Sequence, residues 1–158
     1  MRNDKWKTYL FWIALAEAVG ILAGILSRNG TMTYQAEITQ PPLSPPGALF
    51  PIVWGILYTL MGIGAARISI SEPSPVRSVG LNLFVIQLAV NFLWPLIFFN
   101  AQAYGFAVLW LLFLWILVAA MIFVYRKSDT LAAILQIPYL LWLTFALYLN
   151  IGAWLLNK

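Results

Sequence analysis

Amide and aromatic side chains recur at helical spacing within the apolar parts of this chain. Gln87, Asn91 and Trp94 follow one another at intervals of four and three residues, which places them on one face of a helix. An amide in an apolar environment is costly unless it is hydrogen-bonded or faces a cavity. We therefore expect these groups to point inward, where amides and indoles from separate helices would surround a flat, mostly apolar ligand.

Two further apolar segments repeat this pattern. Trp54 and Tyr58 share one helical face, and Tyr139, Trp142 and Ala146 share another. A purely structural interpretation is the alternative, because Trp and Tyr gather at membrane interfaces while Asn and Gln join helices by hydrogen bonds. The spacing alone leaves both interpretations open. The candidate ligand-binding residues are Trp54, Tyr58, Gln87, Asn91, Trp94, Tyr139, Trp142 and Ala146.

Glu17 is the ionisable residue that lies well inside an apolar segment. An acid at the centre of a membrane costs a few kcal/mol, and no base in the apolar segments can pair with it. We expect it to be protonated or hydrogen-bonded to groups such as Asn91 or Tyr58. Such an acid indicates proton coupling or recognition of a cationic ligand. The alternative is an acid tolerated beside the small residues Gly20 and Gly24, which favour close helix packing.

Residue types that are missing exclude several kinds of chemistry. The chain has no cysteine and no histidine, which excludes disulfides, thiolate nucleophiles, zinc sites of the usual kind and haem held by those residues. No nucleophile–base pair, carboxylate pair or phosphate-binding loop is present, so we predict no catalytic residue and no metal site. The basic residues lie between apolar segments and form no patch for nucleic acid.

Composition places the chain among membrane proteins. It is 63% hydrophobic and 9% charged, with a mean hydropathy of +0.87, and the segment from Ser78 to Tyr125 holds no charged residue. Continuously apolar runs of ~20 residues predict crossing helices rather than barrel strands, which alternate. We predict an all-α protein, a single five-helix transmembrane domain over residues 1–158. The expected crossings are residues 8–26, 48–66, 79–99, 103–125 and 131–156.

The segment 27–47 is predicted to be one long loop. Arg28-Asn29-Gly30 is expected to end the first helix. Prolines at 41, 42, 45 and 46 prevent a helix near the end of the loop, because each proline fixes φ and lacks an N–H donor. A stiff apolar loop is either a lid or a plain connector. The lid candidates are Pro41, Pro45 and Pro46.

The distribution of basic residues predicts the orientation. With five crossings, one side collects Arg2, Lys5, Lys7, Arg67, Arg77, Arg126 and Lys127, and the other side has only Arg28 and Lys158. The positive-inside rule then places the N-terminus in the cytoplasm and the C-terminus outside. We expect an integral protein of a bacterial cell membrane, with the lipid bilayer as its first partner.

Several short motifs occur together and in order along the chain. Pro45-Pro46 precedes the segment Phe50–Trp54, an Asn-x-x-Trp motif follows at Asn91–Trp94, and a Pro-Tyr-x-x-Trp motif follows at Pro138–Trp142. In these segments the chain resembles the TspO/MBR family, the tryptophan-rich sensory proteins and translocator proteins that include the peripheral benzodiazepine receptor. The resemblance covers nearly all of the chain.

This resemblance implies a five-helix membrane bundle, often a homodimer, that binds porphyrins such as protoporphyrin IX. It also implies sterols or benzodiazepine-site ligands in some members, a sensory, regulatory or transport role, and no obligatory cofactor. The pocket residues carried over are Trp54, Tyr58, Asn91, Trp94, Trp142 and Ala146. The loop departs from the family pattern, because Gln40, Leu43 and Ala48 stand where relatives have a lysine and two tryptophans.

Two other functions remain as alternatives. Some bacterial relatives promote light-dependent porphyrin breakdown, so the chain is an enzyme in the second hypothesis, with Trp and Tyr as neighbours of the reacting ligand. In the third hypothesis it is a small proton-coupled exporter that uses Glu17. Compact exporters of that kind have four crossings, so the fifth argues against it.

Overall fold

The computed structural model describes residues 4–158, and no strand occurs among them. Five helical segments are long and apolar enough to cross a membrane, which confirms the predicted all-α bundle. The crossings are α1 (Lys5–Leu26), α3 (Leu49–Ile70), α4 (Pro75–Pro95) with its continuation η2 (Leu96–Asn100), α5 (Tyr104–Ser128), and the pair α6 (Thr130–Ile134) and α7 (Ile137–Leu156).

The helix boundaries follow from local chemistry. Pro75 opens α4 at a position where the missing N–H costs nothing, and the Ser74 side chain accepts a hydrogen bond from the backbone N–H of Arg77. Asp129 caps α6 in the same way through the backbone N–H of Ala132. The segment Glu72–Ser74 is a short non-helical connection between α3 and α4.

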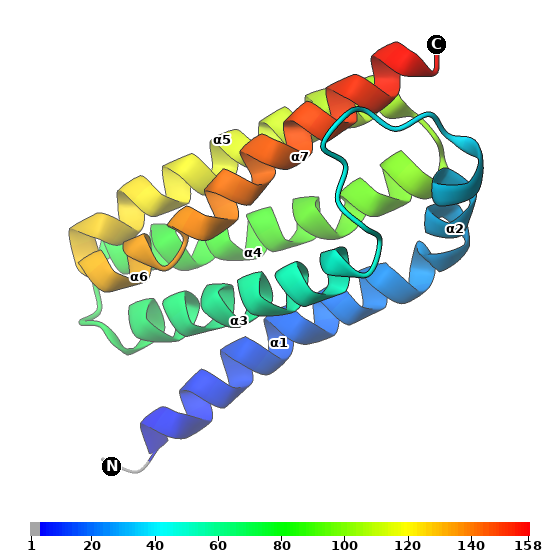
Figure 1. Ribbon diagram of the computed structural model, residues 1–158. Helices are drawn as coiled ribbons and strands as arrows, with labels where there is room; N and C mark the ends of the chain where they lie inside the picture. Colours follow the sequence, from blue (N-terminus) through cyan, green and yellow to red (C-terminus); the bar gives the residue numbers. More distant parts are fainter. Residues whose placement is uncertain (1–3) are drawn as a thin grey trace.

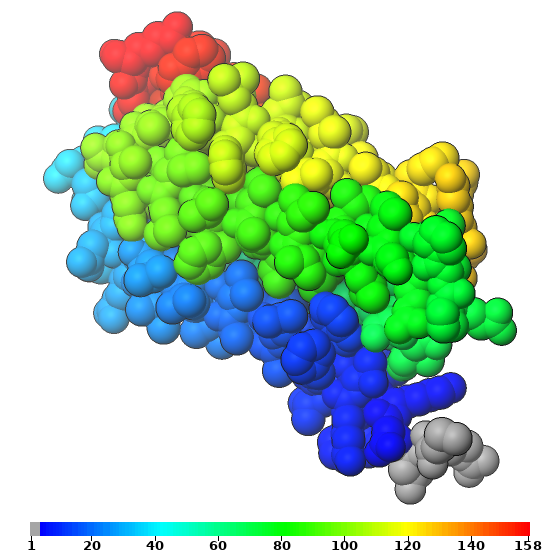
Figure 2. Space-filling view, turned by 180° about the vertical axis from the view of Figure 1, so that it is seen from behind, coloured from blue at the N-terminus to red at the C-terminus, as the bar shows by residue number. Residues whose placement is uncertain are grey.

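The crossings form a ring rather than following one another in sequence order. In Figure 1, α1 lies along α3, α4 lies behind, and α5 and α7 run together above them. α1 packs most extensively on α3, and α4 packs on α5, which in turn packs on α7. Figure 2 shows α4 and α5 side by side from behind, with the first turns of α1 projecting at one corner. The ring is closed by contacts of α3 with α6 and of α1 with α4.

The two ends of the bundle differ, and we name them here. The loop end is covered by residues 27–48, and the opposite end carries the ion pair between Arg67 and Asp129 at 2.9 Å. N- and C-termini lie at different ends (Figure 1). The loop end carries Arg28 and Lys158, and the other basic residues within 4–158 lie at the opposite end. Arg2, one of the residues that predict the orientation, lies outside the described residues, and the cytoplasmic placement of the N-terminus stays a prediction.

The end of α4 widens into a π-helix. Pro95 lacks the N–H that would continue the α-helical pattern, and Ala101 then donates its N–H to the carbonyl of Leu96 at 2.9 Å, five residues earlier. Such widened turns concentrate at functional sites. Here the turn carries Phe98 and Phe99 at the loop end.

The prediction of one long loop over 27–47 is wrong in its first half. Arg28–Glu37 forms the helix α2, and Arg28-Asn29-Gly30 begins that helix instead of ending α1. The break is one residue, Ser27, whose hydroxyl donates to the carbonyl of Ala23 at 2.8 Å. The chain changes direction at Ser27 without a glycine or proline there. The Arg28-Asn29-Gly30 segment, which predicted the end of α1, lies inside α2 instead. Residues 41–47 are non-helical, as the prolines predicted.

Candidate functional site: a hollow at the loop end

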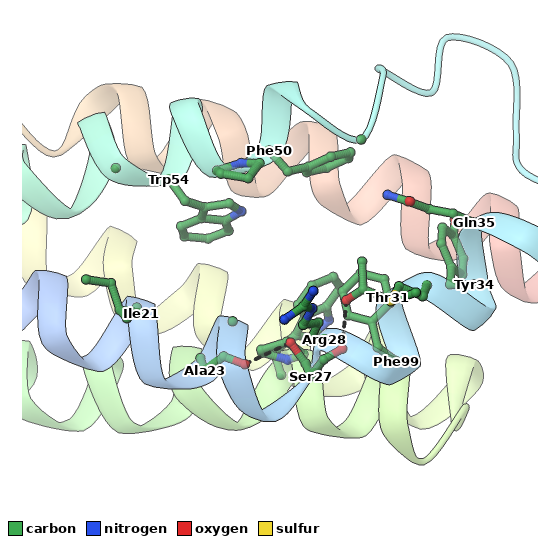
Figure 3. A pocket seen from close by; sticks show the side chains of 18 of the residues that line it. Ile21, Ala23, Ser27, Arg28, Thr31, Tyr34, Gln35, Phe50, Trp54 and Phe99 are labelled. Carbon is green, nitrogen blue, oxygen red and sulfur yellow. Dashed lines mark hydrogen bonds between the residues drawn. The ribbon is translucent and has the colours of Figure 1, made fainter.

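A hollow of about 770 Å³ lies at the loop end between α1, α2, α3 and α4, beneath the proline-rich loop. Its volume falls within the range of pockets that bind small molecules and cofactors. Figure 3 shows Phe50 and Trp54 facing it from α3, with Ser27, Arg28 and Thr31 on the side of α1 and α2. The hollow is mainly apolar, and its polar groups come from a few separate positions.

Aromatic and amide groups from α3 and α4 form two walls of the hollow. Trp54 and Tyr58 lie one turn apart on α3, with ring centroids 5.4 Å apart. Asn91 and Trp94 lie on α4, and Trp94 stacks on Phe98 at 4.9 Å. Helical spacing therefore placed these four predicted residues correctly in one cavity.

A chain of buried hydrogen bonds fixes the Asn91 amide. The Tyr58 hydroxyl donates to Asn91 Oδ1 at 3.1 Å, and Asn91 Nδ2 donates to the Tyr139 hydroxyl at 2.6 Å. Tyr139 in turn donates to Gln87 Oε1 at 2.7 Å. Because each buried polar group has a partner, the cost of burying it is largely offset. Gln87 and Tyr139 do not line the hollow; they lie behind Asn91 and hold it in place.

A second pair of hydrogen bonds fixes Trp94. Its indole N–H donates to Asn150 Oδ1 at 3.1 Å, and Asn150 Nδ2 donates to the carbonyl of Tyr104 at 2.9 Å. The last crossing and the start of α5 thus hold the indole ring. Asn150 shares the helical face of Tyr139 and Trp142, and its role is to position Trp94 from α7.

Glu17 lines the hollow, but its hydrogen-bond partner differs from the expected ones. The hydroxyl of Thr59 donates to Glu17 Oε1 at 2.9 Å, whereas Tyr58 points to Asn91. The expected partners, Asn91 or Tyr58, are therefore wrong. The reason is helical geometry: Thr59 follows Tyr58 on α3 and so points about 100° away, toward α1.

Residues of α1 and α2 complete the lining, and the predicted site did not include those of α2. Arg28, Thr31 and Gln35 line the hollow from α2 at helical spacing. That i, i+3, i+7 stripe would have revealed them had this segment been recognised as a helix. Gly20 contacts the Tyr58 ring, whereas nothing lies within 4 Å of where a side chain on Gly24 would begin. Only part of the small-residue ridge of α1 therefore serves close packing.

Tyr34 closes the hollow near the π-helical turn. Its ring lies 5.1 Å from that of Phe98 and 5.4 Å from that of Phe99. Burial, with a smaller contribution from neighbouring Tyr104, raises the pKa of Tyr34 to about 12. The phenol is therefore uncharged at neutral pH and presents an aromatic face to the hollow.

The loop covers the hollow and is anchored to the last helix. Pro45 and Pro46 line the hollow, as predicted for a lid. Pro41 lies instead against Gly152 of α7, where a side chain on the glycine would clash with the proline ring. Asn157 donates to the carbonyl of Thr39 at 2.8 Å and accepts from its N–H at 3.0 Å. The Tyr148 hydroxyl donates to the carbonyl of Pro42 at 2.7 Å.

Trp142 and Ala146 lie outside the lining of the hollow. Trp142 packs edge-on against Phe50 at 5.8 Å, and Phe50 does line it. Trp142 therefore supports a wall of the hollow from behind, in the way that Tyr139 supports Asn91. This face of α7 contributes no residue to the lining; Trp142 and Tyr139 instead pack against Phe50 and Trp54 of α3.

Comparisons with known proteins agree with this geometry. The TspO/MBR family profile matches residues 12–155. The tryptophan-rich protein TspO of Chlorobaculum tepidum is 31% identical over 156 residues, 98% of this chain and 99% of the relative. Protein CrtK of Rhodobacter capsulatus is 37% identical over 122 residues, 77% of this chain and 76% of the relative. The human translocator protein is 34% identical over 143 residues, 89% of this chain and 85% of the relative. The chain is an integral membrane protein that belongs to the TspO/MBR family.

Proposed function

We propose that the hollow binds a flat, mostly apolar tetrapyrrole such as protoporphyrin IX, and that binding serves a sensory or regulatory role. The observation that carries the proposal is the convergence of Trp54, Trp94 and the fixed Asn91 amide on one cavity of about 770 Å³. Indole faces suit the faces of a flat ring system. A relative of this chain is named tryptophan-rich sensory protein, which favours the sensory role.

The fixed Asn91 amide gives the hollow a specific polar group. Its two hydrogen bonds to tyrosines are made before any ligand arrives. A group held in place in this way loses little conformational entropy when it contacts a ligand. The site therefore combines preorganised aromatic walls with one oriented polar group, as organic-ligand pockets do.

A titration with protoporphyrin IX tests the proposal. In detergent micelles, tryptophan fluorescence should fall as porphyrin binds, and Trp54→Ala should weaken binding about tenfold, the loss expected for one well-placed aromatic contact. Trp115→Ala is the matched control, because Trp115 donates to Thr144 on the exposed side between α5 and α7. Equal affinities for the wild type and Trp54→Ala would refute this site.

A light-dependent reaction is the second candidate function. The Trp54 ring lies 5.4 Å from that of Tyr58 and 6.2 Å from that of Tyr139, so oxidisable side chains would surround a light-excited porphyrin. The same titration under illumination in air distinguishes the two functions. A coloured product that forms faster than in free porphyrin, and that requires Trp54, would favour the enzyme.

Sedimentation of the same samples would test the homodimer that the family resemblance predicts.

Proton-coupled export is the third function and makes a separate prediction. Glu17 lies at the hollow with Thr59 as its hydrogen-bond donor. Vesicle efflux driven by a proton gradient and abolished by Glu17→Gln would favour export. Porphyrin binding that survives Glu17→Gln, without any efflux, would favour a sensor.

A further inference from the structure

The charge at the hollow is unevenly distributed. Its lining includes two charged side chains, Glu17 and Arg28. They are eleven residues apart along α1 and α2, which corresponds to about 16 Å of helix. Glu17 is hydrogen-bonded to Thr59. Arg28 lies nearer to the loop and points into the hollow below Trp54 and Phe50 (Figure 3).

Arg28 has no ion-pair partner within residues 4–158. The two ion pairs of that region join Lys7 to Asp4 and Arg67 to Asp129. The first turn of α2 contains no acidic residue, and Glu37 ends the same helix nine residues away, about 14 Å along its axis. Arg28 is an exposed residue that also lines the apolar hollow, and the planar fork of N–H donors on its guanidinium is available to a ligand.

From this we propose that Arg28 selects ligands that carry a carboxylate on one edge, and that it orients that edge toward the loop. The inference rests on the proposed function and specifies its ligand class: a flat apolar body with an acidic edge. Guanidinium and carboxylate match in geometry and form charge-assisted, often bidentate hydrogen bonds. Protoporphyrin IX has this chemistry, because both of its propionate groups lie on one side of the ring.

The neighbouring side chains fit this orientation. Gln35 of α2 and Gln40 of the loop also line the hollow and add neutral polar groups on the side of α2 and the loop. The inner part of the hollow is bounded by Tyr58 and Trp54, and its one ionisable group is the acid Glu17, so it offers a ligand carboxylate no cationic partner. A ligand with an acidic edge therefore has one favourable direction in the site.

The test compares protoporphyrin IX with its dimethyl ester, which has the same ring but no charge. We expect the wild type to bind the diacid about tenfold more tightly than the diester, as one charge-assisted hydrogen bond would give. Arg28→Gln should abolish this preference and leave diester affinity unchanged. Added salt should weaken the diacid complex of the wild type and not that of Arg28→Gln. Arg77→Gln, at the opposite end of the bundle, is the matched control.

The outcomes separate this inference from the proposed function. If both ligands bind equally to the wild type while Trp54→Ala weakens both, the pocket stands and the role of Arg28 is refuted. If Arg28→Gln keeps the preference for the diacid, or if Arg77→Gln loses as much of that preference as Arg28→Gln does, the role of Arg28 is likewise refuted. If neither ligand binds, the proposed function fails as well. Diester binding by Arg28→Gln shows that this variant is folded.

A lipid phosphate is a second source of negative charge for an arginine near a membrane surface. The titration is therefore carried out in an uncharged, phosphate-free detergent and repeated with phosphatidylglycerol added. A diacid preference that exists in detergent supports the ligand role. No preference in detergent, together with phospholipid that remains bound to the wild type and not to Arg28→Gln, would assign Arg28 to lipid and overturn the inference.

Discussion

Individual glycines of the helix pair α1 and α3 serve contrary purposes. Toward the opposite end, Gly62 of α3 lies directly against the backbone of Ile13 in α1, where a side chain would clash. At the loop end, Gly24 of α1 and Gly55 of α3 line the hollow, and nothing lies within 4 Å of the first side-chain atom that either would carry. One glycine brings α1 and α3 together, and the other two leave space between them.

This difference shows how a bundle of nearly uniform hydrophobicity builds a cavity. The helices α1 and α3 are apolar along most of their length, so hydrophobicity does not distinguish the packed part of this pair from the hollow part. Close packing at the opposite end fixes α1 and α3 relative to each other. The loop end can then remain hollow, because the helix positions no longer depend on filling it. Substitutions at both ends test this division, in order of decreasing expected effect.

Replacing a packed glycine and an open one should have different effects on stability. Gly62→Ala inserts a methyl group against the α1 backbone and should lower the free energy of unfolding by about 1–3 kcal/mol. Gly24→Ala enters open space in a helix, where alanine is favoured by up to ~1 kcal/mol, and should be neutral or stabilising. Thermal unfolding in detergent measures both. Similar destabilisation by the two variants would show that the ends are packed alike.

A large side chain at the loop end should block the ligand without disturbing the fold. Gly55→Trp places an indole at the edge of the hollow and should weaken porphyrin binding at least tenfold, which is about 1.4 kcal/mol. The thermal midpoint should remain within the range of ordinary surface variants. Ile56→Trp, on the neighbouring exposed position of α3, is the control. Unchanged affinity for Gly55→Trp would place the ligand elsewhere.

Releasing the loop should affect the loop end alone. Asn157→Ala removes both hydrogen bonds to Thr39 and should cost about 1 kcal/mol, because these bonds are exposed. Amide hydrogen exchange should rise in residues 38–48 and stay constant in α3 and α5. Ser128→Ala, which removes a hydrogen bond to Ser71 at the opposite end, should leave the exchange of the loop unchanged. Faster exchange throughout the bundle would contradict a local anchor.

A small gain in stability is expected from the loop itself. The backbone angle φ of Leu43 is 70°, which lies in the left-handed region. In the same turn, the Ser44 hydroxyl donates a hydrogen bond to the carbonyl of Pro41 at 2.7 Å. Leu43→Gly should stabilise the turn by a few tenths of a kcal/mol, because relief of steric strain is partly offset by the flexibility of glycine when unfolded. Thermal unfolding measures the change. A clear loss of stability would mean that the exposed leucine makes contacts of its own.

The sequence predicted the parts of this structure that depend on periodicity. Runs of apolar residues identified the five crossings, and three-to-four-residue spacing placed Trp54, Asn91 and Trp94 on inward faces. The membrane environment makes this possible, because an amide such as Asn91 is tolerated within a membrane only where it is hydrogen-bonded or faces a cavity.

The parts that were missed depend on contacts between segments distant in the sequence. The helix α2 is polar and short, so it lacks the apolar periodicity that marks a crossing. Its position is set by packing on η2 rather than by its own pattern. The partner of Glu17 depended on the rotation of α3 about its axis, and the position of Trp142 behind Phe50 depended on where α7 stands in the ring.

A single residue, Ser27, joins α1 to α2, so a movement of one helix can be passed directly to the other. α2 lines the hollow, while the first turns of α1 stand clear of the bundle at its far corner (Figure 2). The 22 residues of α1 form a rod of about 33 Å. If contact between α2 and a ligand changed the tilt of α1 by about 5° at its Ser27 end, the Lys5 end would move by about 3 Å. Under the proposed sensory function, α1 would carry a change at the hollow from one membrane face to the other.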